Sequence, residues 1–483
     1  MGNIFKLLIV IAIGFAVYGV FKADPEGINI EGTVYTVPAS SVGFYEDLTY
    51  VNDSGVRLSE QEIFDKVFGM IRGAQNYILI DMFLFNDFLG TSAGSYRQLS
   101  EELVNELVSK KEAVPSIDIV LITDPINTVY GGYDSPHLNK LKDAGIHVVV
   151  TDLEVLQDSN PIASGFWRAY FSWFGNSTKE GYLPNPFDEN LPKLGIRSYA
   201  SLLNFKANHR KIMIADKSTP QGVKFSTLVT SANPHDGSSA HTNTAIVIDD
   251  YIWKDVLESE LAVAEFSNVV IPKPKEEFLN RINDVEGGVK VQLLTEEKIR
   301  DGLIKTISAL KEGDTLDIAM FYLSERKVIQ EIEDAASRKV KVRILLDPNK
   351  DAFGREKNGI PNRSVAFELF EIGNDIKVRW CDTHGEQCHT KMVMTKTNKG
   401  YSLLIGSANI TRRNIGGYNL ESNILIESQS LFGALNEARA YFEKVWNNES
   451  GKTYSTEYNT YKDHSYGKSV TYRLMEDLGV SSF

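Results

Sequence analysis

The chain has 483 residues, of which 42 % are hydrophobic and 24 % are charged, and this composition excludes a disordered or low-complexity protein. Its two cysteines exclude a disulfide-dense scaffold and a multi-cysteine zinc protein. The 51 Lys and Arg residues and 64 Asp and Glu residues give a net charge of −13. A net-acidic chain is a poor general binder of nucleic acid, because that affinity depends on neutralising phosphates, although a local basic cleft is compatible with it.

The first predicted element is an apolar helix at the N-terminus. Residues 7–21 carry no charge, and counting from Ile4 the run approaches the roughly 17–25 residues that a membrane-spanning helix needs. A cleaved signal peptide is the alternative, but a cut after Ala23 would leave Phe21 where a small residue is required. We therefore predict a transmembrane anchor over residues 4–22. The charges on its flanks favour a cytoplasmic N-terminus, and hence a single-pass protein of the cell membrane with its lobes on the extracytoplasmic side.

The rest of the chain contains one pattern twice. A strand-like run occurs at residues 77–85 and again at 316–323, and each run is followed by a helical segment and a second strand. The second strands end in Asp-Pro, at residues 124–125 and 347–348. A short strand, a His-x-Lys triplet and a small-residue turn then follow in both copies. Strands that alternate with helices predict an α/β fold with mixed sheets flanked by helices.

This repeat divides the chain into four parts. They are the anchor (residues 4–22), a first lobe (24–288), a second lobe (289–448) and a polar C-terminal tail (449–483) without an assigned role. The first lobe has an additional segment before its His-x-Lys triplet. This segment contains the aromatic residues Phe166, Trp167, Tyr170, Phe171, Trp173 and Phe174. Such aromatic residues favour a membrane interface, and an amphipathic helix packed on the core is an equally good interpretation.

The chemistry is predicted from the two triplets, His209/Lys211 and His389/Lys391. Residues i and i+2 of a strand point to the same face, so each triplet presents an imidazole and an ammonium group to one pocket. The small-residue turns add a hydroxyl and an amide each, and these candidate substrate-binding residues are Ser231, Asn233, Ser407 and Asn409. The intervals from Asn233 to Asn409 and from Asn243 to Asn419 are both 176 residues, which pairs the two copies.

Two His, two Lys and two Asn side chains in one cleft suit a tetrahedral phosphate. The Lys and Asn side chains would hold the non-bridging oxygens and stabilise their charge. One His would attack phosphorus, and the other would protonate the leaving alcohol and then deprotonate the incoming one. The scheme requires no metal ion and no cofactor, because the ammonium groups supply the positive charge.

This doubled pattern resembles the phospholipase D superfamily, whose two half-sites carry His-x-Lys-x4-Asp followed by Gly-Ser-x-Asn. Residues 208–212 are most similar to the first motif of bacterial cardiolipin synthases. The resemblance implies two lobes related by pseudo-twofold symmetry, with one active site at their interface. It also implies metal-independent phosphodiester transfer through a covalent phosphohistidine, with His209 as the nucleophile and His389 as the acid and base.

Each copy departs from the family pattern at one acidic residue. The first motif is complete, with Asp216 five residues after its Lys, whereas the second has Lys396 at that position. The second copy has the downstream carboxylate, Glu421, which by resemblance orients a catalytic His. The first copy has Asn243, Thr244 and Ala245 there, with Asp249 as a candidate substitute. A catalytically degenerate phosphate-binding protein is therefore an alternative function.

The substrate is not fixed by this site, because the family contains lipid enzymes and nucleases. The apolar N-terminal segment, the acidic balance and the aromatic segment favour a phospholipid substrate and a membrane bilayer as partners, with nucleic acid as the less favoured alternative. Water as acceptor would make the chain a phospholipase, and phosphatidylglycerol would make it a cardiolipin synthase. The sequence selects neither acceptor and no oligomeric state.

Cys381 and Cys388 flank the approach to His389. A disulfide between them would fit an extracytoplasmic location, and two free thiols fit the sequence equally well.

Overall fold

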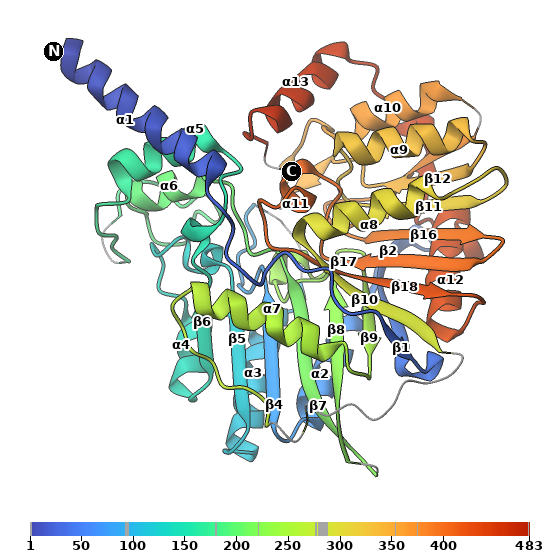
Figure 1. The fold of residues 1–483 in the computed structure, drawn as a ribbon, viewed down its shortest axis with the longest axis horizontal. Helices are drawn as coiled ribbons and strands as arrows, with labels where there is room; N and C mark the ends of the chain where they lie inside the picture. Colours follow the sequence, from blue (N-terminus) through green and yellow to red (C-terminus); the bar gives the residue numbers. More distant parts are fainter. Residues whose placement is uncertain are drawn as a thin grey trace.

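The fold consists of two α/β lobes whose sheets face each other (Figure 1). The computed structural model describes residues 2–91, 96–178, 181–220, 222–275, 278, 288–352, 354–373, 375–481 and 483, without the side chains of residues 2, 3 and 5. The predicted boundary between the lobes, at residues 288 and 289, directly follows residues 279–287, which lie outside this description.

The first lobe is built on a mixed sheet. Its strands are β2 (Val42–Val51), β3 (Arg57–Glu60), β4 (Tyr77–Met82), β5 (Asp118–Thr123), β6 (His147–Val150), β7 (Lys211–Thr219), β8 (Gly222–Thr230) and β9 (Asn243–Ile248). Within the described residues their order is β3-β2-β9-β8-β7-β4-β5-β6. Strands β4, β5 and β6 are parallel, and the remaining neighbours are antiparallel. Strand β4 is buried along its whole length, which explains why its sequence is apolar except for the buried Asp81.

The second lobe is built on a similar sheet. Its strands are β1 (Tyr35–Val37), β10 (Val289–Thr295), β11 (Thr315–Met320), β12 (Lys341–Leu346), β15 (Ile376–Cys381), β16 (Lys391–Thr397), β17 (Gly400–Gly406), β18 (Ser422–Ser428) and β19 (Ser455–Glu457). The order in the described part of the chain is β1-β10-β18-β17-β16-β11-β12-β15-β19. From β18 to β15 this order and the strand directions repeat those from β9 to β6. The predicted α/β fold with mixed sheets is confirmed. A separate hairpin consists of β13 (Asp351–Ala352) and β14 (Arg355–Glu356).

Helices cover the outer face of each sheet and also join the two inner faces. The helices are α1 (Gly2–Phe21), α2 (Ile63–Gly73), α3 (Leu99–Ala113), α4 (Pro136–Asp143), α5 (Pro161–Phe166), α6 (Ile196–Leu202), α7 (Trp253–Phe266), α8 (Glu296–Ser308), α9 (Arg326–Ser337), α10 (Asn362–Ile372), α11 (Arg412–Ile415), α12 (Gly433–Asn447) and α13 (Tyr466–Asp477). Buried residues of α2, α3 and α4 pack on the first sheet, and those of α8, α9 and α10 pack on the second. Apolar positions three and four residues apart give these helices the buried stripe that this packing requires.

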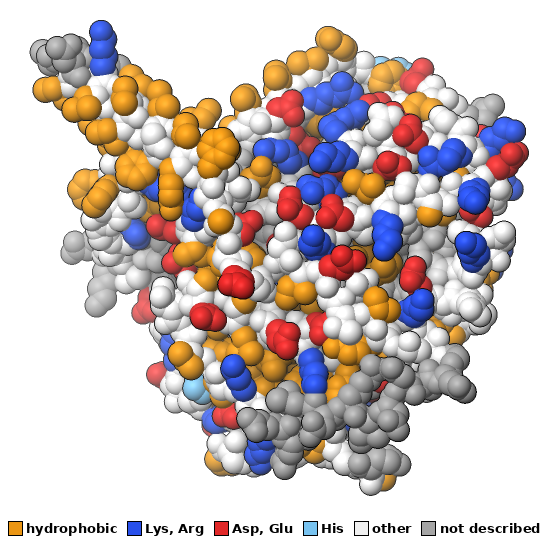
Figure 2. All heavy atoms as spheres, viewed as in Figure 1, with side chains coloured by type: hydrophobic (Ala, Val, Ile, Leu, Met, Phe, Trp, Pro, Cys, Tyr) orange, Lys and Arg blue, Asp and Glu red, His pale blue; other side chains and the backbone are white. Residues whose placement is uncertain are grey.

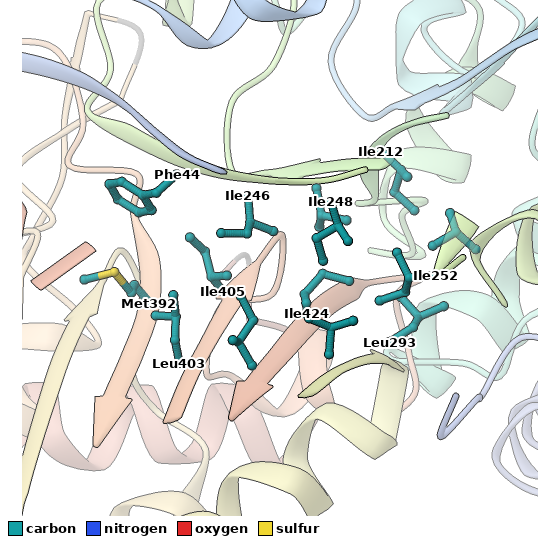
Figure 3. Packing of buried hydrophobic residues seen from close by; sticks show 14 of the residues in the cluster. Phe44, Ile212, Ile246, Ile248, Ile252, Leu293, Met392, Leu403, Ile405 and Ile424 are labelled. Carbon is teal, nitrogen blue, oxygen red and sulfur yellow. The ribbon is translucent and has the colours of Figure 1, made fainter. Parts of the chain in front are cut away.

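A single apolar core joins the lobes. Figure 3 shows Phe44, Ile246 and Ile248 of the first sheet directed toward Ile405 and Ile424 of the second. Buried residues of α7 and α12 belong to the same cluster. Because the inner sheet faces are buried against each other, the strand ends that carry the two triplets are held in fixed relative positions.

The N-terminal segment forms helix α1, but the predicted membrane anchor is not supported. In the part of the chain that the structure describes, no helix is both long and apolar enough to cross a bilayer. One face of α1 is instead used for packing: Ala12 is buried, Gly165 of α5 lies against Ala12 and Ala16, and the hydroxyl of Tyr170 donates to the carbonyl of Leu8.

The aromatic segment is partly packed and partly exposed. A single π-helical turn, Trp167–Phe171, continues α5. Trp167 is only 3 % exposed and belongs to the packed interior of this segment, whereas Trp173 is 75 % exposed and its neighbour Phe174 is also exposed. The interpretation as a packed helix therefore holds for Trp167, and Trp173 and Phe174 form an exposed aromatic pair.

The polar tail belongs to the second lobe. Strand β19 pairs with the edge strand β15, and Arg473 of α13 forms an ion pair of 2.9 Å with Glu368 of α10. The short strand β1, from the N-terminal side of the first lobe, pairs with β10 at the opposite edge. Both ends of the chain therefore contribute to the second sheet.

Candidate active site

Each His-x-Lys triplet ends at the first residue of a strand, Lys211 of β7 or Lys391 of β16. The His of each triplet bonds to the backbone of the other lobe. The amide of His209 donates to the carbonyl of Leu420 at 2.9 Å. In the same way the amide of His389 donates to the carbonyl of Thr242 at 2.8 Å. These reciprocal bonds bring both triplets into one site at the interface of the lobes.

A cavity of about 300 Å³ opens between the triplets, lined by His209, His389, Asn233 and Asn409. An aromatic ring lies edge-on against each imidazole, with ring centroids 4.7 Å apart for Phe83 and His209 and 4.9 Å apart for Phe321 and His389. Such contacts fix the ring orientations. The two Phe residues directly follow β4 and β11, so the repeated strand-like runs already contained the signal for them.

The two lysines of the triplets are buried at the same site. Nζ of Lys211 donates to the carbonyl of His209, and Nζ of Lys391 donates to the carbonyl of His389, both at 2.8 Å. Burial lowers the pKa of Lys211 to about 7. Burial, together with the neighbouring Lys211, holds the pKa of Lys391 well below its usual range. Two buried cations that repel each other are stabilised by a bound anion, as a phosphate group would be.

The two imidazoles have different partners at Nδ1. His209 Nδ1 lies 2.7 Å from Oε1 of Glu421. His389 Nδ1 lies 2.9 Å from the carbonyl oxygen of Ser231 and 3.2 Å from Oδ1 of Asn243. Burial lowers the pKa of His209 to about 4, against the opposing effect of Glu421. One ring is therefore bound to a carboxylate and the other to neutral oxygens.

Asn243 is the structural counterpart of Glu421. The hydroxyl of Ser231 donates to Oδ1 of Asn243 at 3.0 Å, as the hydroxyl of Ser407 donates to Oε2 of Glu421. The equal intervals in the sequence paired Asn243 with Asn419, and this pairing is wrong by two residues. The segment from Ser231 to Asn243 is two residues shorter than the segment from Ser407 to Glu421. The first half-site has an amide where the second has a carboxylate.

His241 occupies the position that corresponds to Asn419. The amide of Gln387 donates to Nδ1 of His241, and the amide of Ala207 donates to Oδ1 of Asn419, and both acceptors line the cavity. Asp249, the candidate substitute carboxylate, bonds to Lys217 and Ser226 instead and does not line the cavity.

Asp216 lies away from the cavity. Its carboxylate accepts hydrogen bonds of 2.8–3.2 Å from the amides of Gln75, Asn76 and Tyr77, so it caps the turn that enters β4. At about 3.3 Å per residue, its position five residues beyond Lys211 places it roughly 16 Å along the strand. Lys396 at the corresponding position of β16 therefore removes no group from the site.

The two serines of the small-residue turns are fully buried behind the cavity. Each donates to the group that orients a histidine, as described above, and neither lines the cavity. The two serines therefore position the groups that orient the histidines, whereas Asn233 and Asn409 border the cavity directly. Oδ1 of Asn409 has no hydrogen-bond partner among the described residues, which leaves this amide available to a ligand.

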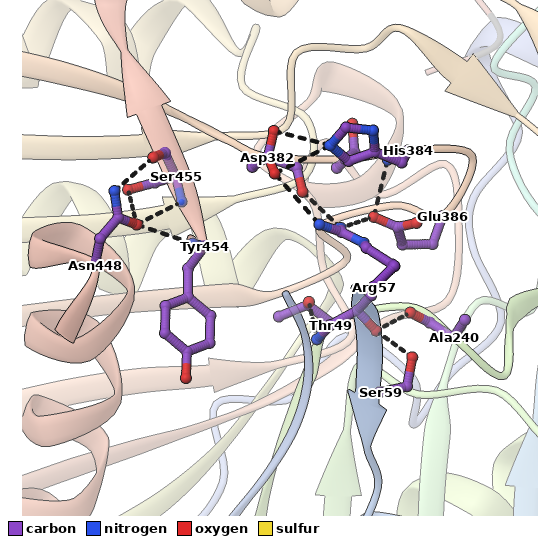
Figure 4. A network of polar contacts seen from close by, with 12 residues as sticks. Thr49, Arg57, Ser59, Ala240, Asp382, His384, Glu386, Asn448, Tyr454 and Ser455 are labelled. Atoms are coloured by element: carbon purple, nitrogen blue, oxygen red, sulfur yellow. Dashed lines mark hydrogen bonds and ion pairs between the residues drawn. The ribbon is translucent and has the colours of Figure 1, made fainter. Parts of the chain in front are cut away.

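A disulfide joins Cys381 and Cys388, so the structure contains the first of the two alternatives. Figure 4 shows the loop between them bound to the first lobe. Arg57 of β3 pairs with Asp382 at 3.3 Å and with Glu386, and His384 lies 3.0 Å from Asp382. These contacts fix the segment that leads directly into His389.

Sequence reasoning missed several residues of the cavity wall. They are Arg413, Lys357, His241 and Phe483. Arg413 donates to the carbonyls of Ser481 and Phe483, and burial lowers its pKa to about 10. Arg413, Lys357 and Phe483 lie outside the repeated pattern, and His241 was missed because the equal intervals paired Asn419 with Asn243 instead. Within the described chain, no group of three or more His, Cys, Asp or Glu side chains could hold a metal ion.

The comparisons with known proteins agree with this geometry. The family model described as "Cardiolipin synthase, PLD-like domain" matches residues 303–446. Residues 303–446, which make up most of the second lobe, are therefore similar to the phospholipase D-like domain that this model describes. No curated protein sequence matches the chain.

Among solved structures, the fold is similar to a phosphatidylserine synthase of Haemophilus influenzae, with a TM-score of 0.57 and 10 % identity over 94 % of this chain and 96 % of the other. A polyphosphate kinase of Porphyromonas gingivalis overlaps with a TM-score of 0.44, at 11 % identity, over 86 % of this chain and 51 % of the other. At these identities the likeness to the synthase concerns the fold alone.

The burial of His235 is expected to make the free energy of unfolding depend on pH. Its Nε2 donates to the carbonyl of Phe88 at 2.7 Å, its Nδ1 lies 2.6 Å from the hydroxyl of Ser238, and burial lowers its pKa to about 4. The unfolded chain takes up a proton at this His below about pH 6.5, whereas the folded chain takes it up only near pH 4. Stability from this group is therefore lost as the pH falls through that window.

We expect the destabilisation caused by His235→Gln to shrink by about 3 kcal/mol between pH 7 and pH 4. Urea unfolding of both proteins at each pH measures it, and groups that titrate in both proteins cancel in the difference. A difference that stays constant with pH would contradict a neutral, buried His235.

Proposed function

We propose that this chain is a phosphodiester hydrolase or phosphatidyltransferase that acts on phospholipids through a covalent phosphohistidine. The observation that carries the proposal is the single cavity lined by both imidazoles and both Asn amides. Lys211 and Lys391 are buried beside it, each bound to the carbonyl of the histidine in its own triplet. The repeated strand order supports two half-sites related by pseudo-twofold symmetry.

In the proposed first step, Nε2 of His209 attacks phosphorus and forms an N–P bond while the P–O bond to the leaving alcohol breaks. Nε2 of His389 gives its proton to that oxygen. In the second step, water or an acceptor alcohol gives a proton to His389, its oxygen attacks phosphorus, and the N–P bond breaks. Lys211 and Lys391 stabilise the charge on the non-bridging oxygens throughout.

The unequal Nδ1 partners support this division of roles. A phosphorylated imidazole carries a positive charge, which the carboxylate of Glu421 stabilises. A general acid must release its proton, and the neutral oxygens at Nδ1 of His389 stabilise the imidazolium less than a carboxylate would, so Nε2 gives up its proton more readily. The negative charge of the bound phosphodiester favours protonation of His389 before the first step.

A lipid substrate is favoured over nucleic acid by an exposed apolar surface on α1, α5 and the aromatic segment. Figure 2 shows hydrophobic side chains gathered along α1. The exposed residues of this surface are Ile4, Leu7, Val10, Ile13, Val17, Phe21, Ile162, Phe166, Trp173 and Phe174. An apolar surface of this kind is typical of a protein that associates with a membrane surface. The disulfide supports an oxidising, extracytoplasmic location.

Product analysis tests this function. The purified chain is incubated with phosphatidylglycerol vesicles, and we expect phosphatidic acid if water is the acceptor or cardiolipin if a second phosphatidylglycerol is. A parallel assay with single-stranded DNA and RNA tests the nuclease alternative. Cleavage of nucleic acid without lipid turnover would reject the lipid function, and absence of both would favour a degenerate phosphate-binding protein.

Metal chelation is expected to have little effect, because in the proposed mechanism Lys211 and Lys391 supply the positive charge, and a bound phosphate stabilises their ammonium forms. We expect turnover in excess EDTA to stay within about twofold of the untreated rate. Removal of an essential metal ion would instead cost several kcal/mol of transition-state stabilisation and lower the rate far more. Complete loss on chelation, restored by zinc or magnesium, would contradict this mechanism.

A further inference from the structure

A second cavity lies apart from the catalytic one and shares none of its lining residues. It has a volume of about 140 Å³ and is bordered by the π-helical turn, α6 and the segment that follows β6. Trp167, Arg168, Arg197, Asn204 and Lys206 line it. The proposed chemistry uses none of these residues.

Several polar atoms of this cavity have no hydrogen-bond partner among the described residues. They are Nε1 of Trp167, Oδ1 of Asn204 and Nε of Arg197. Trp167 is 3 % exposed and Asn204 is 8 % exposed, so water satisfies these atoms poorly. An unmade hydrogen bond of a buried group costs about 1–3 kcal/mol, which a ligand with matching polar atoms would recover. Two of the three atoms are N–H donors, which favours an acceptor-rich ligand.

One cation of the cavity is left unpaired by carboxylates in the described structure, and it is available to an anion. Lys206 and Arg168 both bind the buried carboxylate of Asp158, the first at 2.7 Å. Arg197 has no carboxylate within ion-pair distance in the described structure, and its guanidinium lies over the ring of Trp167, 5.1 Å from the ring centroid. Of the acidic side chains at the rim, Glu154 is exposed and Asp152 accepts from the amide of Glu154. Arg197 is therefore the cation left for a ligand.

The cavity borders the apolar surface of α1. The guanidinium of Arg168 lies 5.6 Å from the ring centroid of Tyr18 of α1, and Nζ of Lys22, just after α1, donates to the carbonyl of Leu156 at 3.1 Å. The apolar side chains of this surface are the ones that Figure 2 shows along the N-terminal helix. A phosphate in the cavity would thus have hydrocarbon-compatible protein surface directly beside it.

We propose that this cavity binds the phosphate of an anionic phospholipid and thereby docks the chain on anionic membranes. The phosphate oxygens would accept from Arg197 and from the indole N–H of Trp167, and the acyl chains would lie along α1 and α5. The site is distinct from the catalytic cavity, so the proposal stands on its own contacts.

The test is co-sedimentation of the full chain with phosphatidylcholine vesicles that contain 20 mol % phosphatidic acid, and with pure phosphatidylcholine vesicles. We expect Arg197→Gln to weaken binding to the anionic vesicles about tenfold, the value of one charge-assisted hydrogen bond, with partial rescue in Arg197→Lys. Arg439→Gln is the matched control, since it removes the same charge from an exposed position of α12. Binding to pure phosphatidylcholine is expected to be unchanged in all variants.

Equal losses in Arg197→Gln and Arg439→Gln would overturn the proposal, because they would show only general electrostatic attraction. Unchanged binding in Arg197→Gln would overturn it as well. Competition by glycerol 3-phosphate at millimolar concentration would assign the cavity to free phosphate esters rather than to a membrane. Turnover of a soluble phosphodiester is measured in parallel. Normal turnover in Arg197→Gln with weakened vesicle binding would support a docking site separate from the catalytic cavity. Absence of turnover in the wild-type chain with normal vesicle binding would reject the catalytic proposal and leave the docking site standing.

Discussion

Alanine in place of His209 or of His389 is expected to lower turnover of a phosphodiester by about 10³-fold or more. Each lobe supplies one of two roles that the other cannot replace, because both rings line one cavity and their Nδ1 atoms are fixed by different partners. The measurement is kcat/KM on a soluble short-chain phosphodiester, which separates chemistry from membrane binding. His147→Ala is the control, since His147 is exposed on β6 and outside the cavity.

The same two variants distinguish the nucleophile from the acid. With a good leaving group such as p-nitrophenolate, the first step needs little protonation, so His389→Ala is expected to accumulate phosphorylated His209 that hydrolyses slowly. His209→Ala is expected to trap nothing. Mass spectrometry of the acid-labile adduct makes the assignment. A phosphate found on His389, or residual activity within tenfold of wild type in either variant, would contradict the mechanism.

The sequence predicted the parts of the fold and site that repeat. Two strand-like runs and two His-x-Lys triplets were enough to predict the mixed sheets, because each copy supports the interpretation of the other. The short strands β1 and β19 gave no such signal. A strand of three residues at a sheet edge is defined by its partner, and the partner is distant in sequence.

Spacing alone was a poor guide to the acidic residues. Asp216 fits the family motif, yet its carboxylate caps the turn before β4, and a motif does not distinguish a turn cap from a group in the cavity. The counterpart of Glu421 was misaligned because one turn is two residues longer than the other, and only the hydrogen bonds of Ser231 and Ser407 reveal the true pairing. A membrane anchor was predicted from apolarity at the terminus, whereas part of α1 is used for packing against α5.

The asymmetry between Glu421 and Asn243 allows two isosteric substitutions that change the charge beside a catalytic histidine in opposite directions. Glu421→Gln keeps the shape but removes the negative charge beside His209, so the positive charge of the phosphorylated ring loses its stabilisation. We expect a loss of about 10³- to 10⁴-fold in kcat, the larger value being the loss when an amide replaces the carboxylate beside the catalytic His of a serine protease. Folding is checked by thermal unfolding, because the carboxylate also accepts from Ser407.

Asn243→Asp instead places a carboxylate beside His389. A nearby negative charge favours the imidazolium, so the pKa of His389 rises toward or above its usual value. A general acid works only while it is protonated, and activity is lost as the pH rises through its pKa. The alkaline limb of the kcat/KM profile is therefore expected to move to higher pH by about one unit, the shift that one close ion pair produces, while Glu421→Gln lowers the whole profile. Profiles from pH 5 to 9 on the soluble diester measure both effects. An unmoved or downward-shifted limb in Asn243→Asp would show that His389 is not the acid, and the roles of the two histidines would then have to be exchanged.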